Sequence, residues 1–244
     1  MTPPVNGNSA LFLDIDGTLL DIARTPDAVV VPDELKNSLE KLRDELGGAL
    51  AFVSGRSLAV IDSLFAPLKG AAIGCHGVEV RGADGKVAAL APPMPDWVTA
   101  FFRGLAASHS GVLLEDKHYV LSLHYRLAPE ARGDLHAALE KERDRLAAAN
   151  ISLLEGKAVI DARPRGVDKG VGVRALLQQS PFHGRHVLFG GDDVTDQDVF
   201  QILPQIGGSG FSVGKPFPGV DHVFASPQAV RQWLARLAIK GMAA

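Results

Sequence analysis

The alternation of short apolar runs with helix-like segments constrains the fold of this chain more than any other feature. Residues 10–13 and 49–53 are continuous apolar runs, and four leucines between residues 35 and 46 recur at helical spacing. Gly47 and Gly48 then end the predicted helix. Because continuous apolar strands are typical of sheets buried on both faces, the pattern predicts an α/β fold with a parallel sheet.

The middle of the chain breaks this alternation. After a predicted hairpin over residues 78–90, the segments are a helix at 95–109, strands at 112–115 and 119–126, a helix at 129–149, and strands at 151–154 and 157–162. This order predicts an α+β domain in which two helices cover an antiparallel sheet. The first alternation returns after Gly166. We therefore expect a core of residues 1–82 and 164–244, interrupted by an inserted domain of residues 83–163.

Composition excludes several classes of protein and partner. The 244 residues carry 25 Lys and Arg against 28 Asp and Glu, a formal net charge of −3, so no positive field favours nucleic acid or an anionic membrane. No apolar run approaches the roughly 18 residues that cross a bilayer. The N-terminal residues lack the pattern of a signal peptide, and the single cysteine, Cys75, cannot pair internally. Composition therefore predicts a soluble, cytoplasmic, globular protein and indicates nothing about its chemistry. Our further expectations, a monomer and a small-molecule substrate, do not come from composition.

Four polar segments stand where predicted strands end or a helix begins. They are Asp14–Thr18 (DIDGT), Val53–Arg56 (VSGR), Asp168–Gly170 (DKG) and Gly191–Asp193 (GDD). In open α/β sheets, ligands bind outside the carboxyl ends of the strands, so one crevice could collect these segments. Taken singly, each residue has an ordinary alternative as a turn former, a helix cap or a surface charge. Taken together, they predict a functional site.

The residue types in these segments suit phosphoryl transfer. Asp14, Asp16 and Asp192 provide the hard oxygen ligands that Mg²⁺ prefers. Lys169 is a point charge for a phosphoryl oxygen, and Ser54 offers a hydroxyl donor. We also expect the turn after Asp16 to expose backbone N–H groups that hold an anion. A carboxylate nucleophile, a divalent metal, a lysine and a hydroxyl are the parts required for transfer through an aspartyl-phosphate.

The same segments resemble a known superfamily. DIDGTLL, VSGR, the lysine of VDKG, and GDDVTDQD resemble the four motifs of the haloacid dehalogenase (HAD) superfamily of phosphatases. Within it, HGVEVR (residues 76–81), the stretch from Lys117 to Arg126, GKAVIDARPRG (156–166) and GDDVTDQDVF (191–200) are similar to trehalose-6-phosphate phosphatases. The resemblance covers nearly the whole chain. It implies a Rossmann-like HAD core with an inserted cap domain that reads the sugar.

The resemblance also implies a role for each core residue. Asp14 is the expected nucleophile, and Asp16 is the expected general acid and base. Ser54 and Lys169 are expected to bind the transferring phosphoryl group.

The implied metal is Mg²⁺. Its expected ligands are the carboxylates of Asp14 and Asp192 and the main-chain carbonyl of Asp16. Asp193 and Asp196 are expected to orient waters or the lysine. The family usually has an acidic residue at position 197, where this chain has Gln. That departure leaves the three aspartates of the motif intact.

In the cap, Lys117 and Asp161 match family positions that bind glucose hydroxyls, and Arg163, beside Asp161, is a further candidate. The family usually has Glu where Asp161 stands, one methylene longer. His76, His124 and Arg126 are candidate substrate ligands by their places near strand ends. Their alternatives are hydrogen-bonded structural roles for the histidines and a surface ion pair for the arginine.

These features together predict a Mg²⁺-dependent phosphatase that hydrolyses trehalose 6-phosphate to trehalose and phosphate. The nearest alternative is another capped HAD sugar phosphatase, acting on sucrose phosphate or mannosyl-3-phosphoglycerate. An alternative of another class is a non-catalytic phospho-aspartate receiver module. A receiver is about half this length and has no need of an acid–base aspartate two residues after the phosphorylated one.

Overall fold

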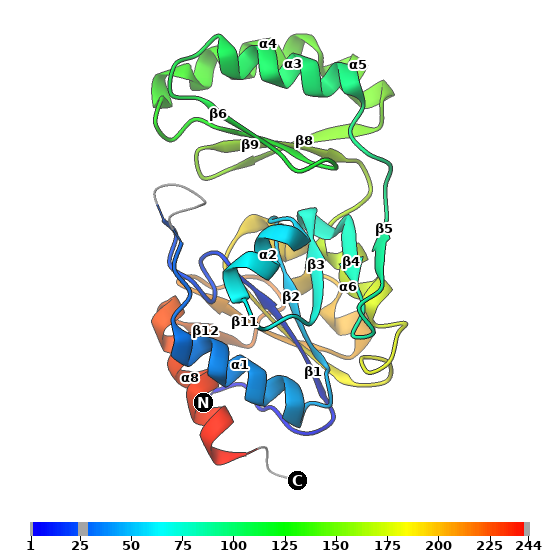
Figure 1. The fold of residues 1–244 in the computed structure, drawn as a ribbon, viewed down its shortest axis with the longest axis vertical. Coiled ribbons are helices and arrows are strands. Elements are labelled where there is room, and N and C mark those ends of the chain that lie inside the picture. Colours follow the sequence, from blue (N-terminus) through cyan, green and yellow to red (C-terminus); the bar gives the residue numbers. More distant parts are fainter. Residues whose placement is uncertain (1, 24–28, 242–244) are drawn as a thin grey trace. The chain divides into compact units, whose positions relative to one another are not determined.

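The computed structural model describes residues 2–23 and 29–241 and divides the chain into two compact units (Figure 1). The core unit contains residues 1–90 and 168–244, and the inserted unit contains residues 91–167. In the described ranges, no helix combines the length and apolarity that a membrane span requires.

The core unit is built on one eight-stranded sheet in the order β12-β11-β10-β1-β2-β3-β4-β5. Six strands run parallel: β1 (Ser9–Asp14), β2 (Leu50–Val53), β3 (Ala71–Gly74), β10 (His186–Gly191), β11 (Ser209–Val213) and β12 (His222–Phe224). At one end of the sheet, β4 (Glu79–Arg81) and β5 (Val87–Ala89) are antiparallel to their neighbours. The predicted parallel sheet is therefore confirmed.

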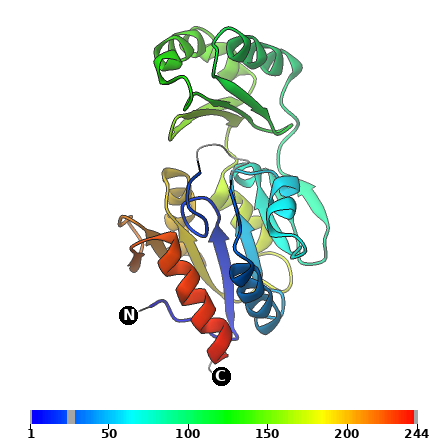
Figure 2. The same ribbon diagram turned by 60° about the vertical axis from the view of Figure 1, so that its left-hand side comes forward.

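Helices cover both faces of this sheet. On one face, Phe52 of β2 stacks on α2 (Leu58–Phe65), and Phe211 of β11 packs on Trp233 of α8 (Pro227–Lys240). On the other, Phe189 of β10 packs on α7 (Gln197–Phe200). Alternating side chains along each strand supply both faces with apolar groups. Figure 2 shows α8 beside α1 (Asp33–Glu45), and these two helices pack against each other.

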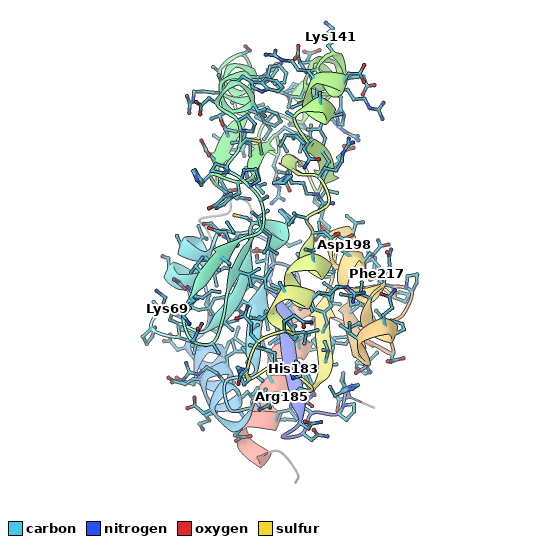
Figure 3. The ribbon with its side chains drawn as sticks, turned by 90° about the vertical axis from the view of Figure 1, so that its right-hand side faces the viewer. Lys69, Lys141, His183, Arg185, Asp198 and Phe217 are labelled. Carbon is cyan, nitrogen blue, oxygen red and sulfur yellow. The ribbon has the colours of Figure 1, made fainter. Side chains whose placement is uncertain are left out.

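The start of α6 (Lys169–Leu176) matters most for the site. The Asp168 side chain caps this helix by accepting a hydrogen bond from the Val171 N–H at 2.9 Å. Gly170 lies so close to the carbonyl of Asp198 that a Cβ on Gly170 would fall 2.5 Å from the carbonyl oxygen. Figure 3 labels Asp198, which belongs to α7 (Gln197–Phe200). The cap and this close packing against α7 hold Lys169 in the first turn of the helix.

The inserted unit is an antiparallel sheet in the order β6-β7-β9-β8, with helices on one face. Its elements are α3 (Asp96–Ala107), β6 (Leu113–Asp116), β7 (Leu121–His124), α4 (Arg132–Lys141), α5 (Arg143–Ala148), β8 (Ile151–Gly156) and β9 (Val159–Pro164). Its separate apolar core includes Phe102, Leu121, Leu123 and Leu135. The predicted α+β architecture is confirmed.

One predicted element is wrong in detail. Instead of a single helix over 129–149, the chain forms a 3₁₀ turn, then α4 and α5, with a break at Glu142 (φ −95°, ψ 4°). Residues 140–145 are all charged, so no apolar side chain packs this turn onto the sheet.

The compact units also differ from the predicted boundaries of 83 and 163. The inserted unit begins at residue 91, because β5 pairs with β4 and extends the core sheet. It ends at residue 167, because β9 reaches Pro164 and the Arg165 N–H donates to the Asn150 carbonyl.

Candidate active site

Three predicted site residues lie at the ends of three neighbouring strands. Asp14 is the last residue of β1, Ser54 follows β2, and Asp192 follows β10. These strands are parallel and adjacent, so their carboxyl ends meet at one edge of the sheet. All three side chains are buried; Asp14 is 4% exposed and Asp192 is 7% exposed.

Lys169 enters this edge from α6. Its Nζ donates to Asp14 Oδ1 at 2.8 Å and to Asp196 Oδ1 at 2.7 Å, and the residue is 3% exposed. A buried ammonium needs such partners, because an isolated charge in a protein interior is strongly unfavourable. The structure thus brings together Asp14, the predicted nucleophile, and Lys169.

The charges in this cluster shift one another's pKa values. Although burial alone would lower the pKa of Lys169, the charges of Asp14 and Asp196 hold it well above its ordinary value. Burial raises the pKa of the Asp14 carboxyl, as do the charges of Asp196 and Asp192, whereas Lys169 lowers it. The lysine is therefore charged at neutral pH, and the cluster carries an excess of negative charge.

This excess fits a divalent cation. Carboxylate oxygens of Asp14, Asp192 and Asp196 lie within 4.8 Å of one another, and all three residues are buried. Asp14 Oδ2 is buried and has no hydrogen-bond partner among the residues that the structure describes. Asp196 is already engaged, since its Oδ1 accepts from Lys169 and its Oδ2 accepts from the N–H groups of Asp192 and Asp193. Asp14 and Asp192 are thus the better placed ligands for a hard cation.

Gly17 allows the Asp192 carboxylate to approach the first motif. This glycine has φ +93°, and a Cβ there would fall 2.3–2.4 Å from three atoms of the Asp192 carboxylate. Its own N–H donates to the Leu20 carbonyl at 2.7 Å. The prediction that this turn exposes its N–H groups to an anion is therefore wrong for Gly17, because the turn closes on itself.

Asp16 has a partner that the sequence reasoning missed. The Arg56 guanidinium binds the Asp16 carboxylate in bidentate fashion, with Nε at 2.6 Å from Oδ2 and Nη2 at 2.7 Å from Oδ1. The Asp16 side chain is still 34% exposed. Arg56 is the last residue of the VSGR segment, so a charged residue in a phosphate-site motif was the available signal. The Arg56 N–H also donates to Ser54 Oγ at 3.1 Å.

The remaining core candidates lie beside these groups. Asp193 precedes a short 3₁₀ turn and forms a capping box with Asp196. His76 is buried, and its ring lies against Gly55 of the VSGR segment.

In the inserted unit, polar side chains gather on the face opposite the helices. Ser122 pairs with Glu115 on one side and with Asp161 on the other, so these three side chains share that face. Lys117 Nζ donates to Ser122 Oγ at 2.9 Å and lies 3.4 Å from Glu115 Oε2. Arg163, two residues beyond Asp161 on β9, lies on the same face. The structure therefore places Lys117, Asp161 and Arg163, three predicted sugar ligands, on one face of the inserted sheet.

Glu115 is the member of this face that the sequence reasoning missed. Its Oε2 lies 2.9 Å from His124 Nε2. Although burial alone would raise the pKa of Glu115, His124 and Lys117 hold it below its ordinary value. The available signal was its position at the end of a predicted strand, two residues before Lys117.

Arg126 lies two residues past the end of β7. Its exposed guanidinium donates to the Lys157 carbonyl at 3.1 Å, in the turn between β8 and β9. This contact ties the turn to the end of β7.

Comparison with known proteins agrees with this geometry. The family model for trehalose-phosphatase matches residues 12–220. A probable trehalose-phosphate phosphatase of Sinorhizobium fredii is 43% identical over 235 residues, covering 95% of this chain and 88% of that protein. The trehalose-6-phosphate phosphatase of Escherichia coli is 34% identical over 235 residues, covering 96% of this chain and 88% of that protein.

A solved structure supports the fold. The C-terminal domain of the C. albicans trehalose-6-phosphate phosphatase has a TM-score of 0.81 and 24% identity, covering 96% of this chain and 92% of that one. With the family match over most of its length and the 43% identical relative, the chain belongs to the trehalose-phosphatase family.

Proposed function

We propose that this chain hydrolyses trehalose 6-phosphate to trehalose and inorganic phosphate. The family match and the names of the relatives support the substrate. The observation that carries the proposal is the Asp14 carboxylate, in which Lys169 binds one oxygen and the other is buried without a hydrogen-bond partner among the described residues. A carboxylate oriented in this way is suited to act as a nucleophile.

In the first step, Asp14 Oδ2 attacks phosphorus in line, and the bond between phosphorus and the sugar oxygen breaks. Asp16 gives its proton to the departing sugar oxygen, which leaves as trehalose. In the second step, Asp16 takes a proton from water, whose oxygen attacks the aspartyl-phosphate. The bond from phosphorus to Asp14 then breaks, and phosphate is released.

The neighbouring groups prepare both steps. Lys169 and Ser54 bind the transferring phosphoryl group, and the lysine offsets the repulsion between the Asp14 carboxylate and the phosphate dianion. Arg56 holds the ionised Asp16 carboxylate in one orientation through two hydrogen bonds, which suits the step in which Asp16 takes a proton from water. This pair opens before Asp16 gives a proton to the sugar oxygen. Asp196 anchors Lys169 from the opposite side. Asp193, at the start of the turn that carries Asp196, supports the same arrangement.

We propose that Mg²⁺ is the metal. The carboxylates of Asp14 and Asp192 and the main-chain carbonyl of Asp16 would hold it, as a hard set of oxygen ligands. When bound, the ion supplies positive charge that offsets the acidic cluster and the phosphoryl oxygens. The buried, negatively charged cluster of Asp14, Asp192 and Asp196 supports this assignment.

We assign the sugar to the inserted unit, as a cap domain that sets substrate specificity. Lys117, Asp161 and Arg163 would bind hydroxyl groups, since a site built from buried polar groups rejects analogues that leave those groups unpaired. His124 acts through Glu115, which it contacts, and Arg126 holds the β8–β9 turn. The contacts of Glu115 with His124 and Lys117 keep the side chains on this face oriented.

We further propose a cytoplasmic monomer. The single cysteine, Cys75, is buried, which suits a protein that needs no disulfide. Size-exclusion chromatography with light scattering measures the mass in solution, and a dimer would contradict this part of the proposal.

The deciding experiment is a phosphate-release screen. Trehalose 6-phosphate, sucrose phosphate, mannosyl-3-phosphoglycerate and p-nitrophenyl phosphate are compared with Mg²⁺ and with EDTA, and Asp14→Asn is the inactive control. We expect the highest kcat/KM for trehalose 6-phosphate and no turnover in EDTA. Preference for another sugar phosphate would transfer the proposal to that substrate, and absence of turnover would favour a receiver module.

A further inference from the structure

Three consecutive residues after β3 adopt a left-handed backbone. Cys75 has φ 49°, His76 has φ 55°, and Gly77 has φ 108°. We call Cys75–Gly77 the histidine turn. Residues other than glycine rarely adopt this conformation, and it persists only where the surrounding structure imposes it. The histidine turn is therefore held by its neighbours.

Those neighbours include the last three residues of the VSGR segment. The Cys75 N–H donates to the Arg56 carbonyl at 2.8 Å, and the His76 N–H donates to the Ser54 carbonyl at 3.1 Å. Between these two bonds lies Gly55. A Cβ on Gly55 would fall 2.4 Å from Cε1 and 2.5 Å from Nε2 of His76, so the imidazole lies directly on the Gly55 backbone. The histidine turn thus contacts all three residues from Ser54 to Arg56.

The same turn contacts the start of α6. A Cβ on Gly77 would fall 1.9 Å from the Asp168 carbonyl oxygen and 3.1 Å from the Lys169 nitrogen. Asp168 caps α6, and Lys169 is the first residue of that helix. One short turn therefore packs against the backbone that carries Ser54 and the backbone that carries Lys169.

We propose that His76 is a positioning residue for phosphoryl transfer, which acts by pressing its ring onto Gly55. The histidine turn fixes the spacing between the Ser54 hydroxyl and the Lys169 ammonium, and it orients Arg56 against Asp16. This inference deepens the proposed function and rests on it. It gives His76 a different role from the sugar contact that the sequence suggested.

The substrate dependence separates these two roles. A residue that binds the sugar affects trehalose 6-phosphate and leaves p-nitrophenyl phosphate unchanged. A residue that positions the phosphoryl-binding groups affects both substrates, through kcat, because the phosphoryl group is common to both.

The test uses substitutions that keep the backbone conformation. His76→Gly removes the ring, and glycine adopts a positive φ without strain. His76→Asn keeps a planar polar side chain, and asparagine also tolerates a positive φ. For His76→Gly we expect kcat to fall about 10- to 100-fold on both substrates by similar factors, with little change in KM. His76→Asn should lose less.

A double-mutant cycle gives the second measurement. Gly55→Ala alone should reduce kcat, because its Cβ displaces the His76 ring. In the His76→Gly background the same alanine should cause no further loss, because the ring is absent. Additive effects would overturn the proposal.

Other outcomes also refute it. A rise in KM confined to trehalose 6-phosphate would return His76 to the sugar site, and a lower melting temperature with unchanged kcat would leave it a purely structural residue. Orthovanadate binding measured by calorimetry with Mg²⁺ provides a readout without turnover, and we expect about tenfold weaker binding in His76→Gly. If the wild-type protein cleaves only the aryl phosphate, the substrate assignment fails, while the His76 comparison still stands.

Discussion

Replacing Gly17 by alanine tests the geometry of the acidic cluster. The new Cβ would fall 2.3–2.4 Å from three atoms of the Asp192 carboxylate, whereas carbon and oxygen normally approach to about 3.3 Å. The carboxylate must therefore move by about 1 Å. Overpacking of this kind costs about 1–3 kcal/mol of stability. A displacement of about 1 Å at a reacting centre lowers activity about 100-fold.

The alanine also carries a backbone cost, which needs a matched control. Gly17 has φ +93°, and alanine at such a value costs about 1–2 kcal/mol. Gly184 has φ +76°, and within the described part of the chain no atom outside Gly184 and its two chain neighbours lies within 4 Å of a Cβ built there. Gly184→Ala therefore has a similar backbone cost without the clash, and the difference between the two variants isolates the displacement of Asp192.

The assay measures phosphate release against Mg²⁺ concentration, together with the free energy of unfolding. Gly17→Ala should need more Mg²⁺ for half-maximal activity and should lose about 100-fold in kcat/KM. Gly184→Ala should lose stability alone. If Gly17→Ala matches Gly184→Ala in metal dependence and activity, Asp192 is not a metal ligand held against Gly17, and the reasoning is refuted.

Three other predictions concern the nucleophile, the sugar face and an ion pair. Asp14→Asn should abolish turnover in the phosphate-release assay without unfolding the protein, and substantial remaining activity would contradict the nucleophile. Lys117→Ala should lower kcat/KM for trehalose 6-phosphate far more than for p-nitrophenyl phosphate, and equal losses would move Lys117 out of the sugar site. Asp62 accepts two hydrogen bonds from Arg81, which lower its pKa; such a charged pair is worth about 1–2 kcal/mol. This stability is present above the unfolded pKa of about 3.9 and is lost as pH falls through the lower folded pKa. The difference in unfolding free energy between wild type and Asp62→Asn should therefore shrink below pH 4, and a constant difference would contradict the ion pair.

Local patterns were sufficient to predict the sheet strands near the site. Residues 10–13 lie in β1 and residues 50–53 form β2, because apolar, continuous runs favour burial on both faces. The break at Glu142 was not predicted, because helical spacing of leucines continues across a charged segment that lacks packing. The pairing of β5 with the core sheet was not predicted either, because the sequence of a hairpin does not indicate which of two sheets its strands extend.

The sequence also did not show which residues far apart along the chain contact each other. Arg56 was overlooked because its partner Asp16 is 40 residues away, and no local pattern joins them. Glu115 was overlooked because an acidic residue on a short strand looks like solvent-exposed charge until the neighbouring strands place Lys117 and His124 around it.

The sequence by itself determined which chemical groups stand at strand ends and helix starts, because apolar periodicity and capping act over a few residues. Only the tertiary structure decided which of these groups meet. Lys169 contacts Asp14 across 155 positions because β10, β1 and β2 pair in that order and α6 is capped at Asp168. Strand order depends on packing over the whole core, so the cluster of one lysine and three aspartates exists only once the chain has folded.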